Sequence, residues 1–512
     1  MSPEALAAEI QSFLAASPHG ALLEDGLPLF DISSAKFSLS TERDKCLLHA
    51  WSEECNIVRR VLDCERKNGS LRIKVQKFGA AKPQTLEIVI DRDQRSPSTK
   101  RSQRATYQRV LARVHAREYA GYSIEKLSSS PDFERSFGPV HVRALVKKGN
   151  SGFAVVGINA AEDQTSVDNL LTTAILWLHD CRERVGHKLL VEGVRLFAPR
   201  GKSAVLRARL AHLNHAAAKL ELSEVEERDE LVEHFDVSDS GNLFTRLVRS
   251  PDRAIVEARF AAAITDIRRI VPETEINIQS PTEVTFRFRG LEFARAKQSL
   301  APNSFAQQME ITFGAGPFET ALTDDSKALF RDLMTRVQES RSLNGTKHDA
   351  LYRMQSERWL ESIIRRDVTV IDSQLDADRV YAQVPAFAAS DRAMIDLLTV
   401  TQSGRLAVLE LKADEDLHLS LQGLDYWSRV QWHHQRGEFQ QFGYFTGKQL
   451  SDEPPMLYLV APALRIHPAT DTLLRYLGSR IDVTLVGINE RWREGVEVVF
   501  RKRRSDVLKA RV

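Results

Sequence analysis

The chain has 512 residues, of which 43% are apolar, 27% charged and 7% aromatic, a composition typical of a folded protein with about three domains. Its 71 basic and 69 acidic residues give a net charge of +2, so any nucleic-acid-binding surface must be local. The four cysteines form no C-x-x-C pair and no apolar run reaches membrane-spanning length, which argues against a zinc clip, a disulfide framework or a membrane partner and favours a cytoplasmic protein.

Residues 1–104 are expected to form a short amphipathic helix, a β-rich module and a linker. Five short strands are expected between residues 36 and 91, in a small sheet or a partly open barrel. The module carries an aromatic residue and three basic residues: Trp51, Arg59, Arg60 and Lys74. A basic sheet face with an aromatic side chain suits nucleic-acid binding, and the alternative is a solvated face without a partner. Residues 92–104 are expected to form a polar, basic linker.

Helices alternate with strands from residue 105 to 222, which is typical of an α/β domain. Residues 223–345 are less regular, with an acidic stretch, a helix and a strand pair, and their sequence indicates no chemistry. The α/β pattern returns over residues 346–512 and ends in a basic segment, RKRRSDVLKARV, which we expect to be a tail. The predicted fold class is therefore α/β within a mixed α+β chain.

The two α/β segments follow one plan. With an offset of 253, IDLLTVTQSGRLAVLELKA lies over VRALVKKGNSGFAVVGINA without a gap. This similarity indicates duplication of one unit, and the alternative is chance similarity between two βαβ segments. The first copy has Arg143, Gly157, Asn159 and Asn169 where the second has Asp396, Glu410, Lys412 and Gln422. Because it lacks both carboxylates, we expect the first copy to be degenerate and to pack, dimerise or hold DNA.

Charged residues interrupt otherwise apolar strands of the second copy. Asp396 lies in MIDLLTV, and Glu410 and Lys412 end RLAVLELK. Gln422 and Tyr426 follow at i and i+4, on one face of the next helix. Two carboxylates and a lysine suit metal-assisted phosphodiester hydrolysis, in which oxygen ligands hold Mg²⁺ and the lysine positions the attacking water. The alternative is a structural Glu–Lys ion pair at a sheet edge.

Residues 350–490 resemble the PD-(D/E)xK nuclease superfamily in their order of a strand-borne Asp, Glu-x-Lys and a helix with Gln-x-x-x-Tyr. The spacing from Glu-x-Lys to Gln is similar to that of the C-terminal domain of NucS-type endonucleases. The resemblance implies a restriction-endonuclease-like fold for both copies. It also implies that Asp396 and Glu410 bind Mg²⁺ or Mn²⁺ and that Lys412 assists the attacking water.

The same resemblance implies roles for three residues on helices. Gln422 and Tyr426 match the helix that orients the active site or contacts DNA in RecB-like members. A helix-borne glutamate precedes the core in this family, and Glu357 fits, with Glu361 one turn later as its rival. The sequence departs from the family pattern because no proline precedes Asp396, at a position that varies widely in the superfamily.

The predicted function is metal-dependent hydrolysis of DNA, by an endonuclease of DNA repair or defence. One active copy per chain cuts one strand, so a homodimer is expected where both strands are cut. A non-catalytic DNA-binding or scaffold protein is one alternative, and a nuclease acting on RNA is another, because the chemistry at the phosphate ignores the sugar. The sequence does not decide whether ends, branches, mismatches or foreign DNA are cut.

Overall fold

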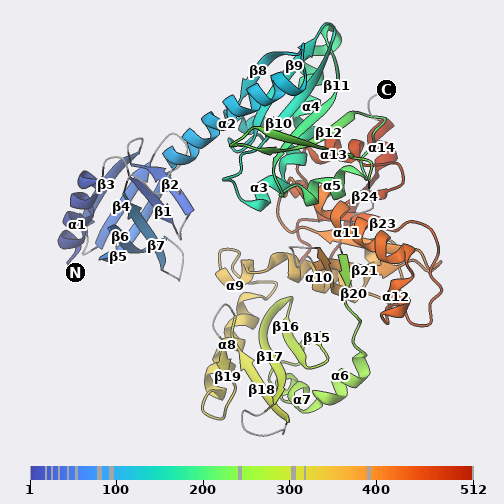
Figure 1. Ribbon diagram of the computed structural model, residues 1–512. Helices are drawn as coiled ribbons and strands as arrows, with labels where there is room; N and C mark the ends of the chain where they lie inside the picture. Colours follow the sequence, from blue (N-terminus) through green and yellow to red (C-terminus); the bar gives the residue numbers. More distant parts are fainter. Residues whose placement is uncertain are drawn as a thin grey trace. The chain divides into compact units, whose positions relative to one another are not determined.

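The computed structural model describes residues 2–509 except 18–19, 25–26, 33–34, 43–44, 52–55, 68, 78–82, 91–96, 240–244, 301–306, 316–318 and 389–393. The chain has the expected mixed α+β fold and divides into two compact units (Figure 1). The N-terminal unit comprises Met1–Val142, Gly157–Asp163 and Glu227–Leu231, and the main unit comprises Arg143–Val156, Gln164–Glu226 and Val232–Val512. Within the described ranges, no helix is long and apolar enough to span a membrane.

The N-terminal unit contains a seven-stranded antiparallel sheet in the order β2-β1-β7-β6-β5-β4-β3. Its strands are β1 (Ala21–Glu24), β2 (Leu27–Asp31), β3 (Lys36–Glu42), β4 (Lys45–Trp51), β5 (Asn56–Lys67), β6 (Ser70–Lys77) and β7 (Gln84–Val89). The five strands expected from the alternating polarity are present. Helix α1 (Pro3–Ala16) buries Leu6, Ile10 and Phe13 against one face of this sheet, so the other face carries the polar residues of the alternation.

The expected linker is partly wrong, because helix α2 spans Pro97–Glu118. Proline is favoured at the first helical position, and the residues that follow it contain neither glycine nor proline. Residues 97–104 therefore belong to a helix, while residues 92–96 lie outside the described part of the chain. Strand β8 (Ser123–Ser128) and the short 3₁₀ helix η1 (Phe133–Arg135) complete the regular elements of this unit.

The first sheet of the main unit contains the first copy of the repeat. Its elements are β9 (Val142–Lys148), β10 (Ser151–Gly157), α3 (Gln164–Asp168), α4 (Leu170–Val185), η2 (Gly186–Lys188), β11 (Leu190–Pro199), α5 (Ala204–Leu210), β12 (Lys219–Glu226) and β13 (Leu231–Phe235). The strands lie in the order β13-β12-β11-β10-β9, and β11 and β12 are parallel.

The second sheet contains the second copy, in the order β14-β20-β21-β22-β23-β24-β25. Its elements are β14 (Thr245–Leu247), α9 (Ala350–Arg353), α10 (Ser356–Arg366), η3 (Val368–Val370), β20 (Tyr381–Ala388), β21 (Met394–Val400), β22 (Leu406–Leu411), α11 (Leu419–Gln435), α12 (Glu438–Gln441), β23 (Met456–Pro462), η4 (Ala463–Arg465), α13 (Thr470–Tyr476), β24 (Asp482–Ile488), β25 (Val498–Arg503) and α14 (Arg504–Lys509). Strands β21–β25 repeat the order of β9–β13, and α11 and α13 occupy the chain positions of α4 and α5. The shared strand order agrees with duplication.

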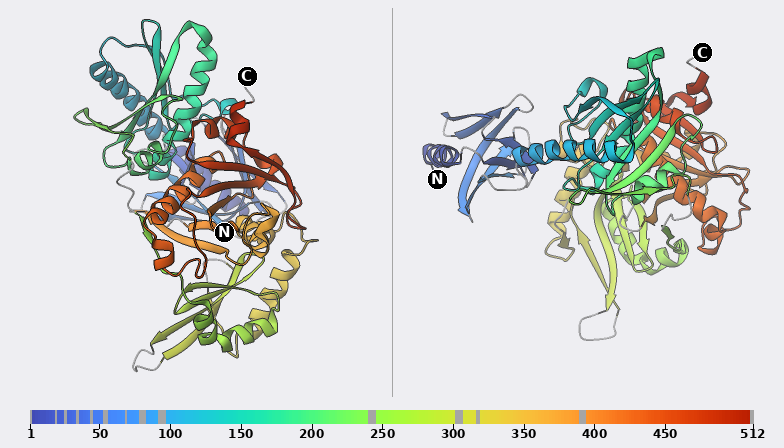
Figure 2. Two further views of the ribbon diagram at one scale, coloured as in Figure 1. Left: turned by 90° about the vertical axis from the view of Figure 1, so that its right-hand side faces the viewer. Right: turned by 45° about the horizontal axis from the view of Figure 1, so that its top comes forward.

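Residues 253–340 form a third part of the main unit, which we call the middle domain. Its elements are α6 (Arg253–Arg259), α7 (Ala261–Ile270), β15 (Glu275–Ser280), β16 (Glu283–Phe288), β17 (Leu291–Leu300), β18 (Gln307–Phe313), β19 (Thr320–Ala321) and α8 (Lys327–Ser340). The strands form an antiparallel sheet in chain order, and β17 and β18 run side by side along their lengths (Figures 1 and 2). Phe260, between α6 and α7, and Ile267 and Phe330 of the helices pack with Phe286 and Phe293 of the strands in one apolar core.

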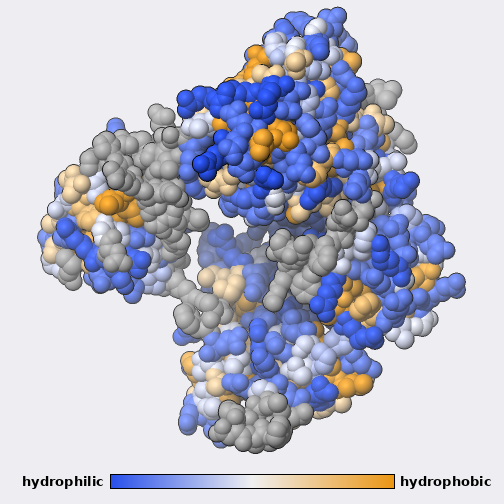
Figure 3. Space-filling model, in the orientation of Figure 1, coloured by the Kyte–Doolittle hydropathy of each residue, from blue (hydrophilic) through white to orange (hydrophobic). Residues whose placement is uncertain are grey.

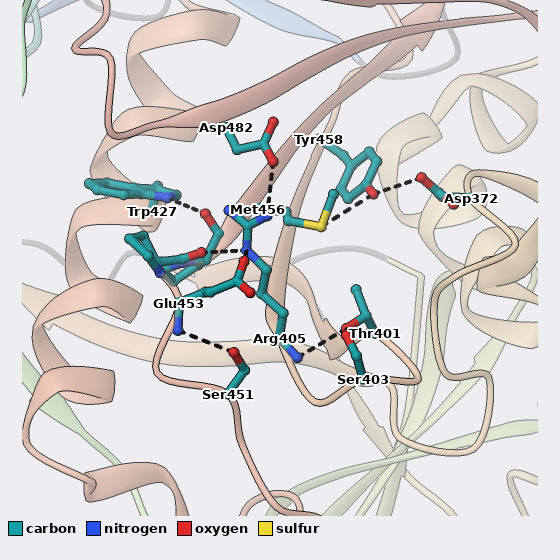
Figure 4. Close-up of polar contacts among 12 residues, drawn as sticks. Asp372, Thr401, Ser403, Arg405, Trp427, Ser451, Glu453, Met456, Tyr458 and Asp482 are labelled. Carbon is teal, nitrogen blue, oxygen red and sulfur yellow. Dashed lines mark hydrogen bonds and ion pairs between the residues drawn. The ribbon is translucent and has the colours of Figure 1, made fainter.

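A polar network fixes the starting ends of the parallel strands in the second sheet (Figure 4). Arg405 directly precedes β22 and donates hydrogen bonds to the carbonyl of Pro454 (2.7 Å) and to Asp482 at the start of β24 (2.9 Å). Trp427 of α11 donates to the carbonyl of Pro455 (2.7 Å), just before β23. The opposite ends of the strands are free of this network, and ligands commonly bind at those carboxyl ends in α/β sheets.

The expected basic tail is wrong, because its first residues form β25 and α14. Arg501 donates to the carbonyl of Ile371 (2.8 Å), and Arg504 donates to the carbonyl of Leu477 (2.9 Å). Pairing with β24 places this charged segment in the sheet, where its arginines satisfy carbonyl groups.

The visible surface is mostly hydrophilic, with scattered hydrophobic residues (Figure 3).

Candidate active site

Asp396 and Glu410 face each other across neighbouring strands. Strands β21 and β22 are antiparallel, with Leu397 opposite Leu409, so the next step of the register places Asp396 opposite Glu410. Opposed residues of an antiparallel pair point to the same face of the sheet. The backbone N–H of Leu411 also donates to Asp396 Oδ2 (3.0 Å), which fixes this carboxylate beside the end of β22.

Lys412 lies among the carboxylates at the end of β22. Its Nζ is 3.2 Å from Glu410 Oε1, 3.6 Å from Glu357 Oε1 and 3.9 Å from Asp416 Oδ2. Burial tends to lower the pKa of this lysine, but the surrounding carboxylates, Glu410 above all, raise it to about 12. Lys412 is therefore a charged hydrogen-bond donor at neutral pH. The ion pair between Glu410 and Lys412 is present, but it does not lie at a sheet edge, because β22 lies between β21 and β23.

Helix α10 adds a second cation and two more carboxylates. Arg358 Nη1 is 2.6 Å from Glu361 Oε2 and 3.3 Å from Asp396 Oδ1. The side-chain amide of Gln383 also donates to Glu361. Glu357 thus contacts the lysine, whereas its rival Glu361 contacts the arginine. The sequence pattern did not single out Arg358 and Gln383, although Arg358 lies between the two candidate glutamates Glu357 and Glu361.

Ion pairs join five carboxylates of this cluster to two cations, Arg358 and Lys412. Burial raises the pKa of Asp396 and raises that of Glu410 well above its ordinary value, with the charge of Asp396 adding to the shift at Glu410. Burial raises the pKa of Glu361 to about 7. Burial is the largest cause of all three shifts, because a carboxylate withdrawn from water favours its neutral form.

The donor atoms of the cluster fit a hard divalent cation. Glu410 Oε2 and Gln422 Oε1 are buried and have no hydrogen-bond partner within the described part of the chain. Oxygen atoms of this kind are the ligands that Mg²⁺ and Mn²⁺ prefer. Among the described residues, no group of three or more His, Cys, Asp or Glu is placed to hold a metal ion. The binding of a metal ion by Asp396 and Glu410 stays a prediction.

Helix α11 carries Gln422 and Tyr426 one turn apart beside the strand ends. Burial, followed by the negative charges of Glu410 and Asp396, raises the pKa of the Tyr426 hydroxyl. This tyrosine therefore stays protonated and can donate a hydrogen bond toward the carboxylates. The structure thus gathers Glu357, Asp396, Glu410, Lys412 and Tyr426, with the half-buried Gln422 on the same helix.

The first copy supports this helix through a buried ion pair. Arg209 of α5 binds both carboxylate oxygens of Asp425, the neighbour of Tyr426, at 2.9 and 2.7 Å. Such paired hydrogen bonds fix orientation as well as distance. The first copy therefore packs against the second copy and positions the helix that carries Gln422 and Tyr426.

The position in the first copy that corresponds to Glu410 has no room for a side chain. A Cβ at Gly157 would lie 2.5 Å from Tyr107 Oη and 3.1 Å from Leu111 Cδ2. Both neighbours belong to α2 and are 2% exposed, so neither can move into solvent. The space that a carboxylate would need is filled by the helix itself.

Gly157→Ala is therefore expected to lower the free energy of unfolding by about 1–3 kcal/mol, because it overpacks a filled core. The thermal unfolding midpoint of the full-length protein measures the effect. Gly138→Ala is the matched control, since nothing lies within 4 Å of its Cβ position. Equal midpoints for the two variants would show that the space at residue 157 is not filled.

The expected basic face of the N-terminal sheet is only partly formed. Arg59 is 6% exposed and pairs with Glu24 at 2.7 Å, so its inclusion among the nucleic-acid-binding residues is wrong. Neighbours in a strand point to opposite faces, which places Arg60 on the outer face when Arg59 is inside. Lys74 is exposed and Trp51 is half-buried on that outer face. Two basic residues and one aromatic residue remain of the expected surface.

The chain was compared with known protein families and with curated proteins. No protein-family model and no curated protein matches the chain.

Proposed function

We propose that this protein is a metal-dependent nuclease that hydrolyses DNA phosphodiester bonds, as an endonuclease of DNA repair or defence. The observation that carries the proposal is the pair Asp396 and Glu410, opposed on neighbouring strands beside Lys412 in a cluster short of positive charge. A divalent cation supplies that missing charge, and a phosphodiester is a substrate whose hydrolysis such a cation assists.

Each residue of the cluster has a role in this proposal. Asp396 and Glu410 would hold Mg²⁺ or Mn²⁺, which supplies Lewis-acid activation of the phosphate and of a water molecule when bound. Lys412, charged at neutral pH, donates a hydrogen bond that orients the attacking water or offsets charge developing on the phosphate. Tyr426 and Gln422 supply further hydrogen-bond donors at the strand ends, while Glu357 holds Lys412 in place.

Cleavage of labelled DNA tests the proposal. Single-stranded, double-stranded, branched and mismatched DNA are incubated with the full-length protein in Mg²⁺ or Mn²⁺, and matched reactions contain EDTA. We expect cutting that depends on the metal, and the preferred substrate identifies the DNA structure that the enzyme acts on. RNA of the same sequence is included, and cutting of RNA alone would support the RNA nuclease instead.

Binding without cutting on every substrate would contradict the nuclease and favour the scaffold alternative. The proposal also includes a cytoplasmic location, and a homodimer where both strands are cut. A monomer acting once at this cluster would leave a nick.

A further inference from the structure

A cavity of about 490 Å³ adjoins the candidate active site and is lined by both the middle domain and the second copy. The middle domain supplies Gln279, Arg287 and Glu292 from three neighbouring strands. The opposite wall includes Arg353, Arg358 and Glu357, and Glu357 is the carboxylate that contacts Lys412. The cavity is therefore continuous with the cluster.

The two walls are held together by close backbone contact. Gly290, in the turn between β16 and β17, approaches α10 so closely that a Cβ there would lie 2.2 Å from the carbonyl carbon of Arg358. Arg341 is fully buried and donates to the carbonyls of Arg289 (2.6 Å), Leu351 (2.7 Å) and Met354 (2.6 Å). Three carbonyls from two parts of the chain thus converge on one guanidinium, which fixes the middle domain against α9 and the residues that lead into α10.

The polar groups that line the cavity are unequally satisfied. Glu292 pairs with Arg295 at 2.8 Å, and Arg358 forms ion pairs with Glu361 and Asp396. Arg287 lies near the negative charges of Glu361 and Glu292, but its buried Nε has no hydrogen-bond partner in the described structure. A buried donor without a partner is costly, so a ligand that accepts its hydrogen bond would be favoured. An arginine in such a place suits a phosphate, whose oxygens match the planar guanidinium.

We propose that Arg287 binds a backbone phosphate of the nucleic-acid strand next to the phosphate held at Asp396 and Glu410. The middle domain, to which the sequence assigns no chemistry, is then one wall of the substrate-binding surface. Arg353 adds a second cation on the opposite wall of the cavity. This inference rests on the proposed nuclease function, because that function places the substrate strand beside the cavity.

The salt dependence of DNA binding tests this contact. Fluorescence anisotropy of labelled single-stranded and double-stranded oligonucleotides is measured with the full-length protein in EDTA, over a series of KCl concentrations. Arg287→Gln is expected to weaken binding about tenfold and to reduce the slope of log K against log salt by about 1, as the loss of one phosphate contact predicts. Arg287→Lys should retain the slope, since it keeps the charge.

Two further variants separate this contact from other effects. Arg269→Gln makes the same charge change on an exposed arginine of the middle domain, with a side chain 74% exposed, and should leave the slope unchanged. Gln279→Glu places a negative charge at an exposed position of the cavity and should weaken binding even if Arg287→Gln does not fold. An unchanged affinity and slope in both Arg287→Gln and Gln279→Glu would overturn the proposal.

The measurements distinguish a wrong phosphate contact at Arg287 from a wrong assignment as a nuclease. Cutting by the wild type, with a slope unaffected by Arg287→Gln, keeps the nuclease and overturns the phosphate contact. A reduced slope without cutting keeps the contact and overturns the nuclease. Titration with dAMP is the last arm: binding of dAMP that requires Arg287, with oligonucleotide binding unaffected by Arg287→Gln, would show a pocket for a free nucleotide and overturn the proposal.

Discussion

Lys412→Ala is expected to abolish DNA cleavage while leaving DNA binding largely intact. The change removes a donor that stays charged at neutral pH and lies 3.2 Å from Glu410. Loss of one such donor from a site where charge develops in the transition state costs about 100-fold or more in rate. Initial rates with Mg²⁺ and dissociation constants in EDTA measure the two effects separately.

Lys448→Ala is the matched control for this variant. Lys448 is a partly buried lysine of the second copy, like Lys412. It pairs with Asp376 at 3.6 Å and donates to the carbonyl of Gln402 (2.8 Å). Lys448 makes these contacts beside the turn between β21 and β22, away from the cluster. Its loss should therefore leave cleavage close to the wild-type rate. A Lys412→Ala protein that cuts as fast as the Lys448→Ala protein would remove the lysine from the mechanism.

Glu410→Gln is expected to abolish cleavage and, at pH 8, to raise the thermal unfolding midpoint by about 2–4 °C. The amide keeps the size of the side chain but removes a charge that burial and Asp396 both disfavour. Residues that serve a function are commonly placed at a cost in stability. Glutamine at position 410 removes this cost in stability and also removes the proposed metal ligand.

The effect on stability should depend on pH in a defined direction. The pKa of Glu410 is raised in the folded protein, so the folded state binds this proton more tightly than the unfolded state does. That contribution to stability is complete below pH 4.5, the ordinary pKa, and is lost as the pH rises toward the folded pKa. The advantage of Glu410→Gln should therefore shrink as the pH is lowered from 8 toward 4.5.

Glu453→Gln is the control for charge removal, because Glu453 is 68% exposed and pairs with Arg405 at 3.5 Å. It should show neither the loss of cleavage nor the pH-dependent difference in midpoint. A Glu410→Gln protein that is less stable than the wild type at pH 8 would contradict the cause assigned to the raised pKa.

The sequence was sufficient for the elements and for the pattern of the second copy. Alternating polarity predicted five strands of the N-terminal sheet, and apolar runs predicted β21 and β22 with their interrupting charges. The fixed offset of 253 predicted a repeat, which agrees with the shared order of β9–β13 and β21–β25. These features are local or periodic, so they can be read without knowing which strands pair.

The sequence was misleading where composition alone suggested exposure. The basic segment after residue 500 looked like a tail, yet pairing with β24 makes it a strand. Residues 97–104 looked like a linker, yet they extend α2. Arg59 and Arg60 point to opposite faces of the sheet because they are neighbours in one strand. The sequence does not show which of the two faces inward, since both are basic.

Only the tertiary structure decided which side chains meet. Strand register placed Asp396 opposite Glu410, and packing of α10 brought Arg358 to Asp396 from 38 residues away. The close approach of Gly290 to α10 made the middle domain a wall of the cavity. The physical reason is that hydrophobic periodicity determines each element separately, whereas the balance of five carboxylates against two cations arises only when distant elements pack together.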